Sequence, residues 1–212
     1  MILLKFVVGP LEVNCYIIAS ESTREATVID AGDEDSRVLS NLKDNGLTLK
    51  YIINTHGHFD HIGGNRTLKD ATGALVLMHR GDVEMLQTAS EQAEFFGIKF
   101  TEPPLPDMYV DDGDEIIFGD IKLKVIHTPG HSKGGICLLS DNMVFTGDTL
   151  FAGAVGRTDF PGGNFKELLS SVRERLMILP DDTIVLPGHG PESTIRDEKE
   201  YNPFVLGLEG EG

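Results

Sequence analysis

The chain has 212 residues, 40% of them hydrophobic, which is enough to bury a full core and favours one domain. Its 34 acidic side chains outnumber 18 basic ones, and the formal charge of −16 argues against phosphate backbones and anionic membranes as partners. The opening MILLKFVVGP lacks the basic start and cleavage site of a secretory leader and is too short to span a bilayer. We expect a first strand there, and neither nucleic acid nor a membrane as a partner.

The two cysteines, Cys15 and Cys137, each lie inside an apolar strand-like run and form no CxxC pair. Buried thiols in a reducing compartment are the expectation, and a thiolate zinc site is excluded. Together with the missing leader, this predicts a cytoplasmic protein.

Runs rich in Val, Ile and Leu, separated by Gly, Asp, Asn or Pro, predict strands along the whole chain. They lie at 2–8, 15–19, 26–30, 50–55, 74–79, 115–118, 121–128, 135–140, 142–148 and 183–189. Helical spacing predicts helices at 35–45, at 64–71 and, most clearly, at 164–179. Asn164 and Glu167 resemble a capping box at the start of the last helix, and Pro180 follows its end.

Strands that cluster in runs, with helices between some of them, favour two packed sheets with helices outside, although the pattern alone leaves a doubly wound sheet open. The chain shows no repeat and no long linker, so we expect a single domain over residues 1–212. The proline-rich stretch 91–110 is predicted to be a loop and a candidate lid.

The stretch THGHFDHIGG at 55–64 places three of the seven histidines and an aspartate within six positions. His56 and His58 would point the same way off an extended turn, while Asp60 and His61 begin the next element. Imidazole and carboxylate groups are ligands that zinc and iron accept. A solvated polar loop would leave the glycines and the preceding buried strand unexplained, so we interpret the stretch as metal-binding.

Three further candidate ligands, His131, Asp148 and His189, each follow a strand-like run and sit beside glycine. Loops at strand ends are where a rigid scaffold brings distant residues together. A lone histidine is more often a satisfied polar group than a ligand, and we expect His79 and His127 to be packed, structural residues.

These motifs together resemble the metallo-β-lactamase superfamily and, within it, the glyoxalase II-like hydrolases. The matching stretches are His-x-His-x-Asp-His at 56–61, TPGH at 128–131, GDTLF at 147–151, GRTDF at 156–160 and PGHGP at 187–191. The resemblance implies an α+β fold, an αββα sandwich, with two divalent metal ions at one edge, zinc first and iron or manganese as alternatives. It implies that His56, His58 and His131 bind one metal, that Asp60, His61 and His189 bind the other, and that Asp148 bridges them.

The chemistry that follows is hydrolysis of a small-molecule thioester such as hydroxyacylglutathione. Two cations sharing a water lower its pKa and give a hydroxide that attacks the acyl carbonyl. Asp60 and Asp148 would orient this nucleophile, and a thiolate leaves without a strong general acid. We expect Arg157 and Asp159 to form an ion pair that supports the metal loop, with direct substrate contact by Arg157 as the alternative, and Lys133 to contact substrate.

The chain departs from full-length glyoxalase II because few residues follow His189, and the helical C-terminal domain that supplies much of the glutathione site is not expected. The stretch EKEYNPFVLGL at 198–208 predicts only a short helix and an apolar tail. The substrate's acyl group and thiol carrier, and the oligomeric state, stay open.

The main alternative is an oxidoreductase, because persulfide dioxygenases also resemble this chain and bind one iron through residues matching His56, His131 and Asp148. β-Lactamase activity is less favoured, since enzymes of that branch with two zinc ions usually lack the equivalent of His61 or of Asp148. A non-enzymatic metal-binding or redox-partner domain would leave the bridging acid unused.

Overall fold

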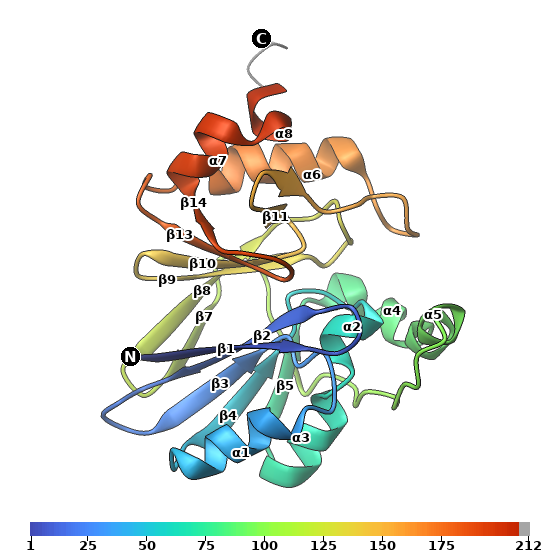
Figure 1. Ribbon diagram of the computed structural model, residues 1–212, viewed down its shortest axis with the longest axis vertical. Coiled ribbons are helices and arrows are strands. Elements are labelled where there is room, and N and C mark those ends of the chain that lie inside the picture. Colours follow the sequence, from blue (N-terminus) through green and yellow to red (C-terminus); the bar gives the residue numbers. More distant parts are fainter. Residues whose placement is uncertain (208–212) are drawn as a thin grey trace.

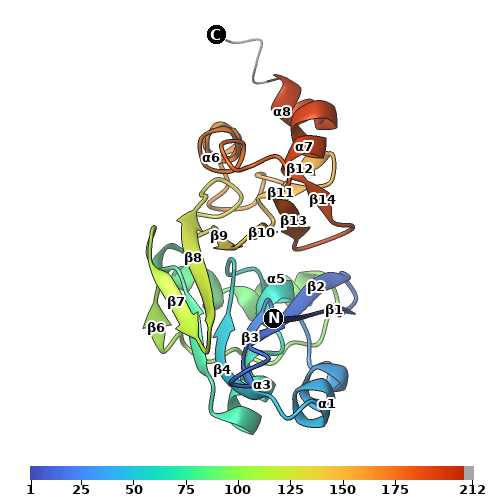
Figure 2. The same cartoon turned by 90° about the vertical axis from the view of Figure 1, so that its left-hand side faces the viewer.

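A computed structural model describes residues 1–207 as two stacked six-stranded sheets with helices on both outer faces (Figure 1). The last five residues of the predicted domain, 208–212, lie outside the described residues. Figure 2 shows the same layers from a second side. The αββα sandwich is therefore confirmed. No helix within residues 1–207 combines the length and the apolar character needed to cross a membrane.

The first sheet has the strand order β1-β2-β3-β4-β5-β6, and its strands are β1 (Ile2–Val8), β2 (Val13–Ala19), β3 (Glu25–Ile29), β4 (Thr48–Ile53), β5 (Leu75–Met78) and β6 (Met108–Tyr109). The first three strands pair antiparallel, and β3 to β6 run parallel. Parallel strands need crossovers, and α1 (Ser36–Asp44) and α3 (Asn65–Thr72) supply two of them on the outer face. These two helices match the predicted ones within one or two residues.

The second sheet has the order β14-β13-β10-β9-β8-β7, and its strands are β7 (Glu115–Phe118), β8 (Ile121–His127), β9 (Ile136–Ser140), β10 (Met143–Gly147), β13 (Ile184–Pro187) and β14 (Ser193–Thr194). Its outer face is covered by α6 (Phe165–Ser171) with a π-helical continuation to Leu176, by α7 (Ile195–Tyr201) and by α8 (Pro203–Leu206). A small ribbon, β11 (Leu150–Phe151) and β12 (Ala154–Val155), follows β10.

Alternation along the strands explains the layers. In β2, Tyr16 and Ile18 face the core between the sheets, whereas Cys15 and Ile17 face the helices, so the whole strand is buried. The Tyr16 hydroxyl donates to the Pro187 carbonyl at 2.8 Å and ties the sheets together. Both cysteines are buried and free, as predicted.

The prediction of a loop over residues 91–110 is wrong at both ends of the stretch. Its first residues belong to α5 (Ala89–Phe95), and its last contain β6. Ala89 and Ala93 are buried against Phe59 of α2 (Phe59–Ile62), and this packing outweighs the weak helical pattern of the stretch. Before α5 lie the short turn Arg80–Asp82 and α4 (Val83–Leu86), neither of which was predicted.

The last predicted helix, 164–179, begins as expected but ends earlier. The Asn164 side chain accepts a hydrogen bond from the Glu167 amide, which is half of the capping box, and the Asn164 amide donates to the Gly130 carbonyl instead of to Glu167. The helix thereby holds the turn that carries His131 against the second sheet.

Candidate metal centre

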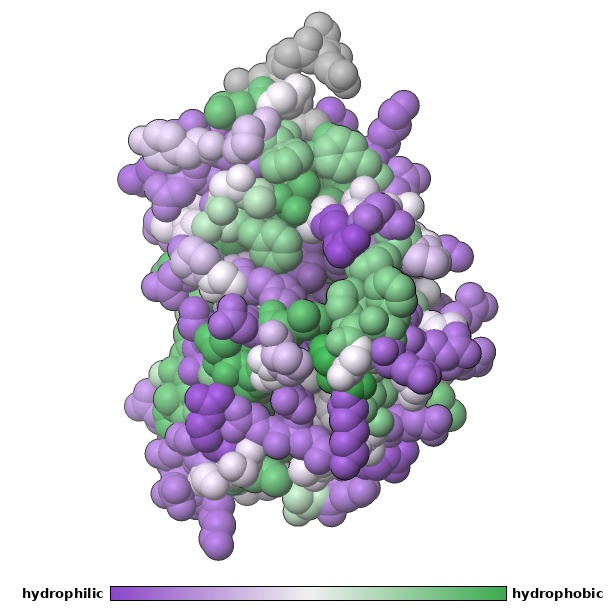
Figure 3. All heavy atoms as spheres, turned by 45° about the vertical axis from the view of Figure 1, so that its right-hand side comes forward, coloured by the Kyte–Doolittle hydropathy of each residue, from purple (hydrophilic) through white to green (hydrophobic). Residues whose placement is uncertain are grey.

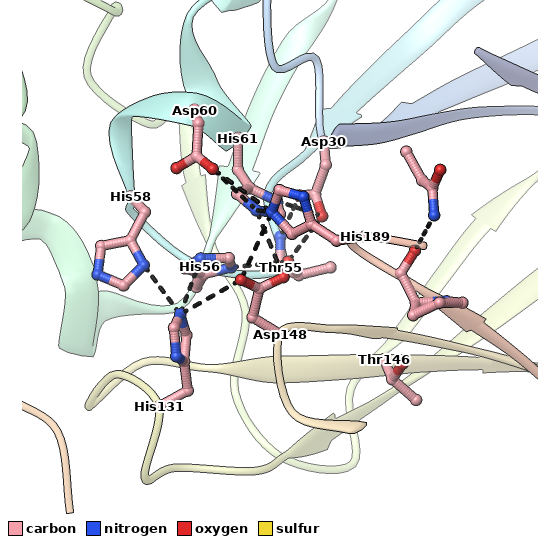
Figure 4. Close-up of polar contacts among 12 residues, drawn as sticks. Asp30, Thr55, His56, His58, Asp60, His61, His131, Thr146, Asp148 and His189 are labelled. Carbon is pink, nitrogen blue, oxygen red and sulfur yellow. Dashed lines mark hydrogen bonds and ion pairs between the residues drawn. The ribbon is translucent and has the colours of Figure 1, made fainter. Parts of the chain in front are cut away.

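The structure brings together all the side chains that the sequence singled out as ligands (Figure 4). His56 and His58 follow β4, Asp60 and His61 lie on α2, His131 is in the turn between β8 and β9, Asp148 follows β10, and His189 follows β13. They form two groups with one carboxylate between them. In one group, His131 Nε2 is 3.3 Å from His56 Nε2 and 2.9 Å from His58 Nδ1.

The second group consists of Asp60, His61 and His189. His189 Nε2 is 3.3 Å from His61 Nε2 and 3.5 Å from Asp60 Oδ2. Asp148 contacts both groups: its Oδ1 is 3.4 Å from His61 Nε2, and its Oδ2 is 3.7 Å from the Nε2 atoms of His131 and His189. The Asp148 carboxylate therefore lies between the two groups, with Oδ2 near a nitrogen of each.

The arrangement fits divalent cations. Nitrogen ligands at about 2.0–2.1 Å around a tetrahedral metal lie about 3.4 Å apart, close to the spacing of these imidazoles. Without a cation, the lone pairs of several imidazole nitrogens converge and repel one another, because two facing nitrogens can share only one proton. In residues 1–207, Asp148 Oδ1 is buried and has no hydrogen-bond donor, as expected for an oxygen that faces a metal.

Hydrogen bonds from outside the groups orient the rings. His131 Nδ1 donates to the Arg157 carbonyl at 2.7 Å, which leaves Nε2 unprotonated and facing the centre. The Thr55 hydroxyl donates to Asp30 Oδ2 at 2.7 Å, so its oxygen accepts from His56 Nδ1 at 3.1 Å. His56 Nε2 is thereby left free as well. Both rings are held in the tautomer that a metal ligand needs.

Asp30 was missed as a site residue. It directly follows β3, is buried, and accepts a hydrogen bond from the Thr55 amide at 2.8 Å. Its Oδ2 also lies 3.0 Å from His61 Nδ1, within ion-pair distance although not aligned for a hydrogen bond. The available signal was an acid at the end of a buried strand, the same signal that selected Asp148.

Asp82 was also missed, and it has no exposed surface. Its carboxylate accepts hydrogen bonds from the Gly57 amide at 3.1 Å, the Ser132 hydroxyl at 2.6 Å and the Gly134 amide at 2.5 Å. These donors belong to the two loops that carry the first group of histidines. A Cβ at Gly134 would lie 2.6 Å from the Asp82 amide nitrogen, so this approach requires glycine.

The metal-free side chains have strongly perturbed pKa values. Burial, with the neighbouring His131, lowers the pKa of His58 to about 3. Burial alone would lower the pKa of His61, but the surrounding carboxylates, first Asp148, raise it to about 10. Burial alone would raise the pKa of Asp60, yet His61 holds it below its usual range. Clustered perturbations of this kind in a cleft are typical of functional sites.

A cleft of about 1000 Å³ opens over the two groups, in the face that Figure 3 shows. Five of the metal-ligand candidates line this cleft, namely His58, Asp60, His131, Asp148 and His189. Side chains of α4 and α5 line one wall, and the segment 155–162 lines another. The candidate lid 91–110 therefore begins, over residues 91–95, with part of a helix that lines the cleft.

The remaining candidates lie at the rim of the cleft. The Arg157 guanidinium pairs with Asp159 through two 2.7 Å contacts and stacks over the Phe160 ring at 3.9 Å. The ion pair exists, but both side chains are exposed, and the contact of Arg157 with His131 is made by its backbone carbonyl. Lys133 also lines the cleft.

His79 and His127 lie outside both groups. Their rings stack at 4.2 Å, His127 Nε2 donates to the Lys133 carbonyl at 3.0 Å, and His79 Nδ1 accepts from the Gly81 amide at 3.1 Å. Both are packed and hydrogen-bonded, as expected from the sequence.

Comparison with known proteins gives consistent results. A family model described as the metallo-beta-lactamase superfamily matches residues 8–189. "Hydroxyacylglutathione hydrolase GloC" from Haemophilus influenzae is 37% identical over 196 residues, covering 91% of this chain and 92% of that protein. "Probable metallo-hydrolase YqgX" from Bacillus subtilis is 37% identical over 205 residues, covering 95% and 96%. These names support a metal-dependent hydrolase.

Solved structures share the fold. BLEG-1 B3 metallo-beta-lactamase has a TM-score of 0.90 at 32% identity, covering 96% of this chain and 99% of that one. TTHA1623 in a di-iron-bound form has a TM-score of 0.87 at 37% identity, covering 95% and 99%. ETHE1 from Myxococcus xanthus has a TM-score of 0.84 at 32% identity, covering 98% and 85%. The chain therefore belongs to the metallo-beta-lactamase superfamily, with His and Asp side chains as the candidate ligands for divalent metal ions.

Proposed function

We propose that this protein is a dinuclear metal-dependent hydrolase that acts on small-molecule thioesters such as hydroxyacylglutathione. The observation that carries the proposal is the position of Asp148, within 3.4–3.7 Å of ligand nitrogens in both groups. A mononuclear centre would not need a carboxylate shared in this way. The similarity to a relative named hydroxyacylglutathione hydrolase supports the thioester class.

The proposed ligand sets follow the two groups. His56, His58 and His131 hold one cation, Asp60, His61 and His189 hold the other, and Asp148 contributes to both. Zinc is the first choice because imidazole and carboxylate suit it, and iron or manganese are the alternatives. The di-iron form of TTHA1623 is a reason to keep iron among them.

Bound there, two divalent cations would lower the pKa of a shared water and polarise an acyl carbonyl. The chain's own residues do the positioning. Asp60 and Asp148 accept hydrogen bonds from the attacking water and fix its direction. The backbone carbonyl of Arg157 and the hydroxyl of Thr55 keep His131 and His56 from rotating. A thiolate leaves readily, so no separate general acid is required of the cleft.

Arg157 and Lys133 are proposed to act at the rim. The Arg157 carbonyl positions His131, while its guanidinium, held by Asp159 and stacked on Phe160, shapes the cleft entrance. Lys133 is proposed to contact substrate. We also propose a cytoplasmic location, which the free, buried state of Cys15 and Cys137 supports.

The second candidate is an oxidoreductase with one iron held by His56, His131 and Asp148, of the persulfide dioxygenase type. The similarity to ETHE1 favours keeping it. Under this alternative Asp60, His61 and His189 would have no metal to bind.

The metal content per chain distinguishes the hydrolase from the oxidoreductase. Protein purified without chelators and under low oxygen is analysed for zinc, iron and manganese, then assayed with a hydroxyacylglutathione thioester and, by oxygen uptake, with glutathione persulfide. Two metals per chain with thioester hydrolysis is the expected result. One iron per chain with oxygen uptake and no hydrolysis overturns the proposal. A β-lactam is included as a substrate because of the similarity to BLEG-1.

A further inference from the structure

The walls of the cleft above the metal-ligand candidates are largely apolar. Met85 on α4, Phe95 on α5 and the adjoining Phe96 line one wall. The other wall includes Val155 and Phe160. Figure 3 shows apolar surface beside the hollow between the two halves of the molecule. A substrate at the metal centre therefore has apolar side chains around it.

The exposure of these aromatic rings needs a reason. Phe95 is 86% exposed and Phe96 43% exposed, although α5 buries Ala89 and Ala93 on its inner side. Single exposed apolar residues are ordinary, but a cluster that lines the cleft of a metal centre indicates a ligand-binding surface. The helix is anchored by its alanines, while Phe95 at its end and the adjoining Phe96 line the cleft.

The charges of the cleft limit what the apolar surface accepts. Glu84 and Glu91 lie on the α4–α5 wall and repel anions. Two basic side chains line the cleft, Arg157 and Lys133. Arg157 is paired with Asp159, whereas Lys133 has no carboxylate within ion-pair distance among the described residues. The two glutamates disfavour an anionic arm along this wall, and the apolar side chains would leave a charged arm poorly solvated. An uncharged arm therefore fits this wall best.

We propose that the cleft selects thioesters that carry an uncharged apolar arm, which lies against Met85, Phe95 and Phe96 while the thioester carbonyl faces Asp148. The inference rests on the proposed function and narrows its thioester class. Thioesters with a neutral apolar arm are favoured over hydroxyacylglutathione, whose glutathione arm carries a net negative charge. Longer unbranched arms are bound more tightly until the wall is covered. The arm belongs either to the acyl group or to the thiol, and the test varies both.

Two series of neutral substrates test the inference on the metal-loaded protein. One varies the acyl arm as acetyl, butanoyl and hexanoyl thioesters of N-acetylcysteamine. The other varies the thiol arm as acetyl thioesters of ethanethiol, butanethiol and hexanethiol. Each kcat/KM is divided by the rate of spontaneous hydroxide hydrolysis. Full burial of a methylene is worth about fourfold, and we expect about twofold in a cleft open on one side, so roughly 15-fold over four methylenes in one of the series.

The variant Phe95→Ala removes a ring that is almost fully exposed, so the fold does not depend on it. It is expected to reduce the gain along the responsive series to less than about half. Leu105→Ala is the matched control. Leu105 lies in the same stretch, 91–110, and is 71% exposed, but it does not line the cleft. An unchanged gain in Phe95→Ala, or an equal loss in Leu105→Ala, overturns the assignment to this wall.

The outcomes for the inference and for the proposed function are distinguishable. If the protein hydrolyses these thioesters but the normalised kcat/KM does not change with arm length in either series, the inference is overturned and the proposed function stands. Hydrolysis of none of these thioesters, nor of hydroxyacylglutathione, overturns the proposed function. In that case calorimetric titration with two thioethers, S-ethyl and S-hexyl N-acetylcysteamine, decides whether the apolar surface binds an arm. Tighter binding of the hexyl compound supports it, and equal binding overturns it.

Discussion

The buried carboxylate of Asp82 accepts a hydrogen bond from the hydroxyl of Ser132 at 2.6 Å, and it does so next to the metal-ligand candidates without being one of them. The same carboxylate accepts from the amides of Gly57 and Gly134. It therefore joins the loop that carries His56 and His58 to the loop that carries His131. The spacing of the first ligand group therefore depends on a carboxylate that is not itself a ligand candidate.

We predict that Asp82→Asn weakens both the fold and the metal site. The Gly57 and Gly134 amides donate to different oxygens of Asp82, and asparagine keeps only one of these acceptors. One buried amide then faces the donor NH2 group and is left unpaired, at a cost of about 1–3 kcal/mol in the free energy of unfolding. Metal affinity is expected to fall roughly 10–100-fold, as for other partners that orient ligands. Denaturant unfolding and a metal titration measure the two effects, with the exposed Asp70→Asn as control. Unchanged affinity in Asp82→Asn would contradict the prediction.

Asp148→Ala removes the carboxylate shared by the two groups. We predict fewer than two metals per chain and a loss of thioester hydrolysis of more than about 100-fold, since a lost ligand costs more than a lost outer partner. Elemental analysis and steady-state kinetics are the measurements. A variant that retains both metals and full hydrolysis would refute the shared-ligand assignment.

Arg157→Ala separates the backbone of this residue from its side chain. The contact with His131 is made by the Arg157 carbonyl, which alanine keeps, so we predict unchanged metal content. The guanidinium at the rim is lost, and a raised KM with similar kcat is the expected kinetic change. Loss of metal would mean instead that the ion pair with Asp159 supports the loop. Asp159→Asn, measured alongside, shows whether the pair acts as a unit.

Two histidines give the metal-free protein opposite pH dependences. The folded pKa of His58 is about 3, so the unfolded chain binds its proton first, and stability is lost as the pH falls from about 6.5 toward 3. The folded pKa of His61 is about 10, so its stabilisation is complete below about 6.5 and is lost as the pH rises toward 10. We therefore predict a stability maximum near pH 6.5.

Urea unfolding of chelator-treated protein at about pH 5, 6.5 and 8.5 tests this. Each histidine contributes at most about 1.4 kcal/mol per pH unit within its window. A midpoint that rises steadily from pH 6.5 to 8.5 would show that the carboxylates around His61 do not hold its proton. Repeating the series with metal bound serves as the comparison, because ligation removes that proton.

The sequence determined the strands and the locally spaced part of the site. The run 121–127 alternates between buried and exposed residues, and the run 15–19 is buried on both faces. Neighbouring residues in the chain encode both patterns, because successive side chains of a strand point to opposite faces. His56, His58, Asp60 and His61 are close in space because they are close in the chain. The pattern alone could not choose between two sheets and one, because it shows which face of a strand is buried and not which strand lies beside it.

Only the tertiary structure decided the rest. Asp82 lies 25 residues from Gly57 and 52 from Gly134, and nothing in the turn 80–82 signals a buried acceptor for those amides. The helix α5 forms where Ala89 and Ala93 meet Phe59, although its own pattern is weak. A buried polar group is stabilised by partners that the fold supplies from distant segments, and such partners leave no local pattern in the chain.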